Sequence, residues 1–463
     1  MSAADDLRHD CTTLFHFVQR VMVLCDNRGG PQRYPAASQV FLDYLSSLGE
    51  ATLNFLDRFT EVVTTTDPIL FLAYRQKLWS LRSGWRTLHS FVKPTKDADT
   101  LSVPNSLISV LTQRVSCIPG FEDARFAVFH TNELNYLHLN TGAIRDIAVQ
   151  LSAIVPNCPG FPDDLGLIGI PYSQAGACHL NSLLAHEIGH YIYQKKTSLG
   201  GLVGLEKSMT VATEQALQPL LDSITAQDVE WFNARIVSWT RELFCDLFAS
   251  RILGPTYTFS YLEISDLSTM ADPSGIPLER SSVFNLSHPA DVYRVREQCR
   301  QLEDTGWWDL IKDTKSAYLA ALNAARTLAD SKLAAPGKKD LAKSALNAFI
   351  AITPSIHHAI KETVALVDSG VEDFKEFDGG IRAHLVRGIV PSTVVVNGQR
   401  RFPGAVALIN TAHKFCLESL DDLIRGIDGQ DEKSARVRST WYERVEMWTL
   451  KALEDNHLLT RQG

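Results

Sequence analysis

The sequence has no run of about 18 or more apolar residues, which argues against a segment that spans a membrane. It also has no excess of positive charge, since 45 Lys and Arg oppose 53 Asp and Glu and leave a net charge of −8. That balance gives no support for nucleic-acid binding. The stretch Met1–Asp6 lacks the basic and then apolar pattern of a signal peptide, so we expect a cytoplasmic protein.

The eight cysteines lack C-x-x-C pairs and the spacing of a disulfide framework, which indicates a reducing, intracellular location. Cys178 and Cys245 could serve as thiolate ligands of a metal. We expect Cys245, however, to lie on a different helix face from the carboxylates around it. Both are therefore predicted to be buried small hydrophobic residues.

Helical periodicity dominates both ends of the chain. Residues 1–120 are predicted to form a helical bundle, and residues 301–463 a second, mainly helical region with a hairpin near 393–402, where Asn-Gly favours a type I′ turn. Between them, residues 121–300 combine helices with short strands. These strands are predicted near 125–130, 134–139 and 166–171. The expected fold class is therefore α+β, predominantly α-helical, with a small β-sheet.

The stretch Leu183–Ile192 contains the pattern H-E-x-x-H at His186, Glu187 and His190. In a helix the two histidines lie one turn apart on the same face, where two imidazoles can bind one metal ion. Glu187 lies beside them and can take a proton from a water at that metal. The pattern is typical of zinc-assisted hydrolysis with the glutamate as general base.

Three further residues bear on this helix. Asn181 or Ser182 could cap its start. Gly189 costs about 1 kcal/mol relative to alanine in a helix interior, so we expect another backbone or the metal cleft to approach it closely. His179, seven residues before His186, either lines the cleft or is a polar residue near the helix start.

A second helix, predicted over residues 228–253, supplies a third metal ligand. Glu242 and Asp246 interrupt its apolar face one turn apart. Two such carboxylates are costly to bury unless a metal or a partner charge receives them. We assign Glu242 as the third zinc ligand and Asp246 as the acceptor for the free ring N–H of a zinc histidine, His186 in preference to His190. Three ligands leave the fourth position open for water, as catalytic zinc requires.

A third element contains His288 followed by Pro289, with Arg294 six residues after the histidine. The combination of H-E-x-x-H, E-x-x-x-D and this H-P segment resembles the gluzincin metallopeptidases, most closely their Ste24/HtpX-like branch. The resemblance covers about residues 165–300. It implies a zincin-like metallopeptidase core flanked by the N- and C-terminal helical regions. The chain departs from that branch in lacking the long transmembrane helices of its membrane members.

The resemblance also implies a role for each matching residue. The Zn²⁺ ligands it implies are His186, His190 and Glu242. It makes Glu187 the general base, places His288 near the cleft, where it could donate a hydrogen bond to the oxyanion, and lets Arg294 hold that segment. Tyr293 and Tyr172 are alternative oxyanion donors, and the sequence does not rank the three firmly.

The strand expected at residues 165–172 directly precedes the metal helix. In zincin-like proteins such a strand commonly borders the cleft and can pair with an extended peptide along its edge. A buried core strand is the equally weighted alternative.

Together these patterns predict a zinc-dependent metallopeptidase that hydrolyses peptide bonds of an intracellular protein or peptide. One alternative is a latent or inactive binding or regulatory protein that zinc stabilises, and another is a zinc hydrolase that does not act on peptides. The helical regions could bind a regulatory partner that controls activity. No nucleic-acid partner is expected.

Overall fold

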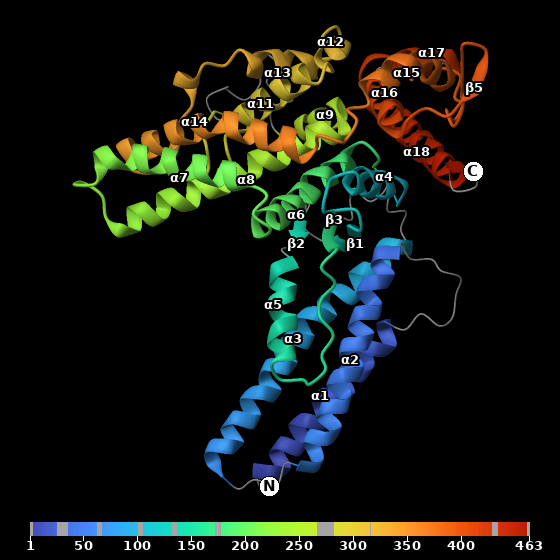
Figure 1. Ribbon diagram of the computed structural model, residues 1–463. Helices are drawn as coiled ribbons and strands as arrows, with labels where there is room; N and C mark the ends of the chain where they lie inside the picture. Colours follow the sequence, from blue (N-terminus) through green and yellow to red (C-terminus); the bar gives the residue numbers. More distant parts are fainter. Residues whose placement is uncertain are drawn as a thin grey trace. The chain divides into compact units, whose positions relative to one another are not determined.

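The computed structural model describes residues 3–25, 36–62, 67–100, 105–131, 137–139, 141–171, 174, 177–265, 282–314, 316–427 and 434–460. Within these residues the protein is predominantly helical with two small sheets, which confirms the helical part of the expected fold class (Figure 1). None of the described helices is both long and apolar enough to cross a bilayer. The chain divides into two compact units, Met1–Asn105 with Asp123–Ala175 and Ser106–Glu122 with Gly176–Gly463. The three regions expected from the sequence stay a prediction.

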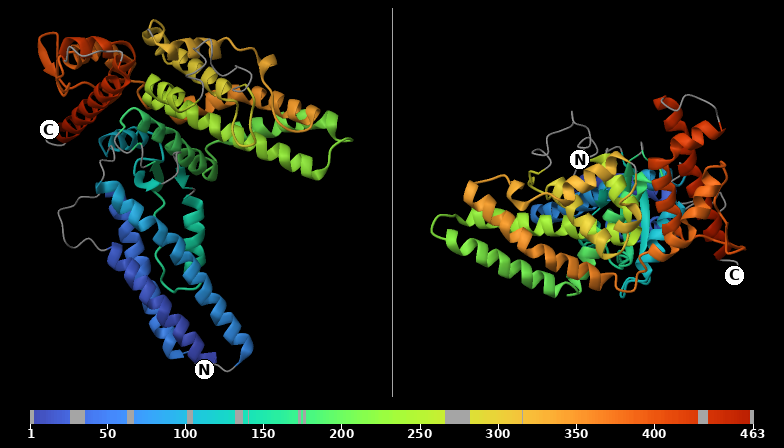
Figure 2. Two further views of the ribbon diagram at one scale, coloured as in Figure 1. Left: turned by 180° about the vertical axis from the view of Figure 1, so that it is seen from behind. Right: turned by 90° about the horizontal axis from the view of Figure 1, so that it is seen from above.

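Unit 1 combines a helical bundle with a sheet. Its elements are α1 (Ala3–Cys25), α2 (Ala36–Val62), α3 (Pro68–Thr100), β1 (Arg125–Thr131), β2 (Leu137–Leu139), α5 (Thr141–Ser152) and β3 (Leu165–Pro171). Helices α1, α2 and α3 lie side by side (Figures 1 and 2). Their apolar faces meet in one core around Trp85, whose indole N–H donates to the hydroxyl of Thr52 (3.2 Å). This arrangement agrees with the bundle predicted for the first part of the chain.

The strand before the metal helix is the central strand of its sheet, in the order β1-β3-β2. Ile168 of β3 lies opposite Val128 of parallel β1 on one side and His138 of antiparallel β2 on the other. All seven residues of β3 are buried. Between Leu167 and Gly169 a peptide cannot pair with this strand, because ladder hydrogen bonds occupy both of its edges there. Outside these three residues the pairing hypothesis stays a prediction. The alternative, a buried core strand, is what the structure contains.

Unit 2 contains the H-E-x-x-H helix. In chain order its elements are α4 (Asn105–Ser116), η2 (Leu180–Leu183), α6 (Leu184–Ser198), α7 (Val203–Leu217), η3 (Gln218–Leu220), α8 (Ala226–Leu253), α9 (Pro255–Ile264), α11 (Asp291–Asp304), α12 (Trp308–Ile311), α13 (Ala317–Arg326), η5 (Asp330–Lys332), α14 (Lys339–Thr363), α15 (Val371–Leu385), β4 (Val394–Val396), β5 (Gln399–Arg401), α16 (Ala405–Glu418), α17 (Leu420–Ile427) and α18 (Ala435–Thr460). Strands β4 and β5 pair around Asn397 and Gly398, which both have positive φ. This confirms the predicted hairpin.

Helices α6 and α8 carry the predicted metal ligands and pack against each other. A capping box starts α8: Thr225 Oγ1 accepts from the amide of Asp228, whose carboxylate accepts from the amide of Thr225. The two helices meet at Gly189, where a Cβ atom would lie 2.9 Å from the Cα of Cys245. The close backbone approach that the sequence predicts at this glycine is confirmed.

The start of α6 differs from expectation. Neither Asn181 nor Ser182 caps it, because both lie inside η2, and neither η2 nor α6 has a side-chain cap of its own. The side-chain amide of Asn181 instead donates back to the carbonyl of Ala177. Short polar side chains often bond to nearby backbone in this way, which sequence spacing alone does not distinguish from a cap.

Gly189→Ala is expected to lower the free energy of unfolding by about 1–3 kcal/mol, because the added methyl meets the backbone of the opposing helix and overpacks the contact. Urea unfolding monitored by circular dichroism measures the change. Gly379→Ala is the matched control. Gly379 is exposed within α15, and a Cβ atom added there would meet no atom within 4 Å, so alanine there should stabilise by about 0.5–1 kcal/mol. Equal effects at both sites would contradict the close approach.

Candidate metal centre

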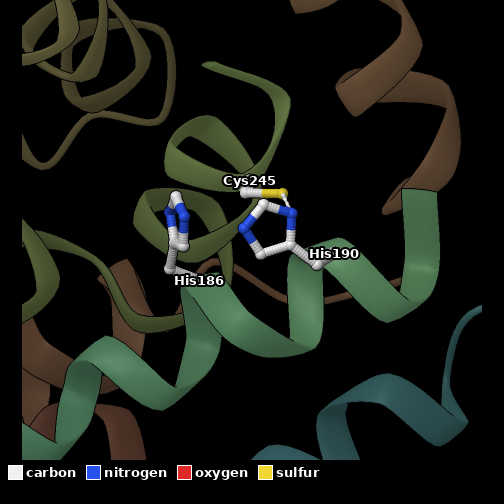
Figure 3. Close-up of side chains that lie close together, drawn as sticks. All are labelled: His186, His190 and Cys245. Atoms are coloured by element: carbon white, nitrogen blue, oxygen red, sulfur yellow. Dashed lines mark hydrogen bonds between the residues drawn. The ribbon is translucent and has the colours of Figure 1, made fainter. Parts of the chain in front are cut away.

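The two histidines of the motif project from the same side of α6 toward the helix that carries Cys245 (Figure 3). Nε2 of His186 lies 3.4 Å from one oxygen of Glu242, and Nε2 of His190 lies 3.7 Å from the other. Ligand atoms around one tetrahedral zinc ion lie roughly 3.3 Å apart at bond lengths of about 2.0–2.1 Å. The Glu242 carboxylate thus approaches both histidines, but through a different oxygen to each. Among the described residues, the group whose ligand atoms all lie within 4.8 Å of one another is His186, His190 and Cys245.

The charges at this cluster favour a cation. Burial by itself lowers the pKa of His186, but hydrogen bonds to Asp246 and Glu242 outweigh burial and raise that pKa to about 10. Burial raises the pKa of Glu242, but the hydrogen bond to His186 together with the charges of His186, His190 and Arg294 outweighs burial and lowers the pKa to about 2. Carboxylates here stay ionised although they are buried. A divalent cation would replace the imidazole proton that otherwise compensates them.

Asp246 fixes the orientation of the His186 ring through its Nδ1 atom. Its Oδ1 lies 2.9 Å from Nδ1 of His186, which is the hydrogen bond predicted from the sequence. Arg294 of α11 donates to both carboxylate oxygens, from Nε at 2.5 Å and from a terminal nitrogen at 2.7 Å. Asp246 is fully buried, and burial raises its pKa, but the Arg294 guanidinium holds that pKa far below its ordinary value. The fixed carboxylate leaves Nε2 of His186 facing Glu242.

Tyr257 is a member of this network that sequence reasoning missed. Its hydroxyl donates to Asp246 Oδ1 at 2.6 Å and lies 3.3 Å from Nδ1 of His186. Gly254, at φ 70°, ends α8 in a backbone conformation that favours glycine, and α9 begins directly after it. That reversal brings Tyr257 to Asp246, eleven residues earlier. No ligand motif marks this tyrosine in the sequence.

Glu187, the predicted general base, follows His186 directly on α6. It is 8% exposed, as buried as His186 itself. Its charge is close enough to contribute to the raised pKa values of His186 and Cys245. Glu187 therefore lies near the candidate ligands His186 and Cys245.

His288 reaches the cluster from the loop before α11. Its Nε2 lies 3.5 Å from Glu242, and its side chain is 42% exposed, so it borders the cluster on the solvent side. Burial lowers its pKa, which favours the neutral ring. Ser287 Oγ lies 2.7 Å from Nδ1 of His288. The same hydroxyl donates to Asn285 Oδ1 (3.2 Å), so this contact does not assign the ring proton of His288 to Nε2.

Two contacts with α8 and one local turn hold this loop. Ser238 Oγ donates to the carbonyl of Ser287 (2.7 Å), and Trp239 Nε1 donates to the carbonyl of Asn285 (3.1 Å). The Asn285 side-chain oxygen accepts from the amides of Ser287 and His288. These polar residues were not singled out from the sequence, although Asn in a turn commonly bonds to backbone in this way. Pro289 precedes α11, whose N-cap residue is Ala290.

Of the two alternative oxyanion donors, Tyr293 and Tyr172, the structure describes only Tyr293. Tyr172 lies outside the described residues. Tyr293 is buried, its hydroxyl is 2.6 Å from Thr353 Oγ1, and its ring packs against Phe284 and Phe349. Among the described candidates, His288 is therefore the one at the cluster.

Cys245 differs from its predicted place. It is buried as expected, but it does not face away from the ligands, since its Sγ lies 3.2 Å from Nδ1 of His190. His186, His190 and Cys245 also form a group that could hold a metal ion, drawn in Figure 3. Burial raises the pKa of the Cys245 thiol well above its ordinary value, and the Glu242 charge raises it further. A bound cation would deprotonate this thiol, so the raised pKa does not decide the ligand set. We favour Glu242 because it faces Nε2 of both histidines, whereas Cys245 lies against Nδ1 of His190.

Comparisons of this chain with protein-family models, with curated proteins and with solved structures find no match.

Arg294→Met is expected to lower the free energy of unfolding by about 3–5 kcal/mol, because it leaves the buried Asp246 charge without its cation. Arg300→Met, on the same helix, is the control. Arg300 is 54% exposed, and its partner Glu297 keeps Arg296, so the loss should stay below about 1 kcal/mol. Chemical denaturation of both variants measures the difference. A similar small loss in each would show that Asp246 does not depend on Arg294.

Proposed function

We propose that the protein is a zinc-dependent peptidase of the gluzincin type, with a zincin-like core built around α6 and α8. The observation that carries the proposal is the approach of two histidine Nε2 atoms to one Glu242 carboxylate, with Glu187 adjacent on the same helix. His186, His190 and Glu242 would hold the ion. A purely structural site gains nothing from a general base beside an open ligand position.

Three side chains have separate roles in the proposed peptide hydrolysis. A zinc ion bound there would act as a Lewis acid toward water and toward a peptide carbonyl. Glu187 takes the proton of the attacking water and passes it to the leaving amine. His288 would donate a ring N–H to the oxygen that becomes negative in the transition state. Asp246 keeps the His186 ring oriented during these steps.

A second candidate is a binding protein that zinc stabilises without catalysis. It is favoured by the group of His186, His190 and Cys245, because a histidine and cysteine set is typical of structural zinc. That arrangement would bind through Nδ1 of His190, the nitrogen next to Cys245. It would leave Glu187 and His288 without a chemical role, and for that reason we place it second.

Glu187→Gln is expected to lower peptide hydrolysis by roughly 10²–10⁴-fold with zinc and fold retained, because the amide cannot accept the proton. Mass spectrometry of a peptide mixture incubated with the zinc-loaded protein measures cleavage. Glu214→Gln, an exposed glutamate on α7, is the control and should keep full activity. Equal cleavage by both variants would refute Glu187 as the base. Ester hydrolysis without peptide hydrolysis by the unmodified protein would favour a hydrolase of another class.

His288→Ala is expected to lower turnover roughly a hundredfold while zinc stays bound, which is the usual cost of losing one oxyanion donor. His358→Ala, a 71% exposed histidine on α14, serves as the control and should be active. Turnover and zinc content are measured on the same samples. A His288 variant that loses its metal would show that the residue is a ligand instead.

A further inference from the structure

His179 begins the segment that leads through η2 into the metal helix, and three distant helices hold it. Its amide N–H donates to Glu446 Oε1 of α18 (2.9 Å), and its carbonyl accepts from Ser260 Oγ of α9 (2.7 Å). Its ring stacks on His413 of α16, with centroids 4.4 Å apart and an interplanar angle of 3°. His179 is fully buried. It therefore does not line the cleft, one of the two roles left open by the sequence.

The contacts continue into a buried polar cluster. The Tyr442 hydroxyl lies 3.4 Å from Nδ1 of His179 and donates to Glu263 Oε1 at 3.1 Å. Nε2 of His413 lies 3.1 Å from the same oxygen. We call this cluster the clamp, and its members are His179, Ser260, Glu263, His413, Tyr442 and Glu446. None of these residues has a part in the proposed chemistry.

Glu446 supplies a side-chain hydrogen-bond acceptor at the start of the segment that leads into α6. Neither η2 nor α6 has a side-chain cap of its own, and the carboxylate that reaches the His179 amide comes from 267 residues later in the chain. A buried amide without an acceptor is costly. The C-terminal helix therefore completes the start of the segment that carries His186 and Glu187.

We propose that Glu446 is a positioning residue for the metal helix, acting through the backbone of His179. The clamp is the route by which the C-terminal helices α16 and α18 set the placement of His186 and Glu187. Helix α9 joins the clamp to the cluster, since it carries both Ser260 and Tyr257. The proposal rests on the proposed function only in treating α6 as a metal helix, because the hydrogen bond to His179 can be tested without a metal.

The pKa of Glu446 makes the stability of the fold depend on pH, which provides a second test of this role. Burial raises the pKa of Glu446 to about 7, from an ordinary 4.5, although the His179 amide lowers it. The titratable groups around it are Cys178, His179, Glu263, His413, Cys416, Tyr442 and Glu443. A raised carboxyl pKa stabilises the fold below the unfolded pKa, and that stability is lost as pH rises through about 7. Glu446→Gln, which does not titrate, should escape this loss.

Hydrogen exchange measured by mass spectrometry on residues 177–192 tests the proposal on the full chain. Glu446→Ala should make these amides exchange about tenfold faster, the usual factor for a lost helix cap, and should weaken zinc affinity in chelator competition. Glu446→Gln retains an acceptor oxygen and should stay within about twofold of the unmodified protein. Glu443→Ala, an exposed site on the same helix, should change neither quantity.

Unchanged exchange in Glu446→Ala, or equal exchange in the alanine and glutamine variants, would overturn the proposal. If the alanine variant does not fold, the pH test decides. The melting temperature of the unmodified protein should then fall relative to Glu446→Gln between pH 5 and pH 8, and no relative change would overturn the role. Exchange needs no metal, so a chain that binds no zinc would refute the proposed function while leaving the positioning role testable.

Discussion

The carboxylate of Asp246 is the group on which the centre depends. It lies on α8 with no exposed surface, and it accepts from His186 of α6, Tyr257 of α9 and Arg294 of α11. A buried carboxylate with one donor would be costly, but three donors and one fixed cation compensate it. Four helices are therefore oriented relative to one another by a single ionised group. That constraint sets the direction in which His186 presents its other nitrogen.

The contact at Gly189 sets the distance between helices α6 and α8. Gly189 allows the backbone of α8 to approach α6 at Cys245. This proximity brings Glu242 to the two histidines and also brings the Cys245 thiol against His190. The same close packing thus creates both candidate ligand sets. The two sets differ in the atom of His190 that they use, since Glu242 faces Nε2 and Cys245 lies against Nδ1.

Much of the centre could be predicted because its spacing is local. Helical periodicity places His186 beside His190 and Glu242 beside Asp246 before any packing is known. The contacts of Tyr257 and Glu446 could not be found in that way, since they depend on how separate helices pack. The same holds for β3, whose residues suit an edge or a centre equally until the strand order is known. The thiol of Cys245 was misplaced because helical faces were counted on α8 alone.

X-ray absorption at the zinc edge of the zinc-loaded protein tests the central claim most directly, because it identifies the atoms that bind the ion. Coordination by His186, His190 and Glu242 predicts only nitrogen and oxygen neighbours, at about 2.0–2.1 Å. A sulfur neighbour at about 2.3 Å would place Cys245 in the ligand set and contradict the account. A chain that binds no zinc at all would contradict it as well.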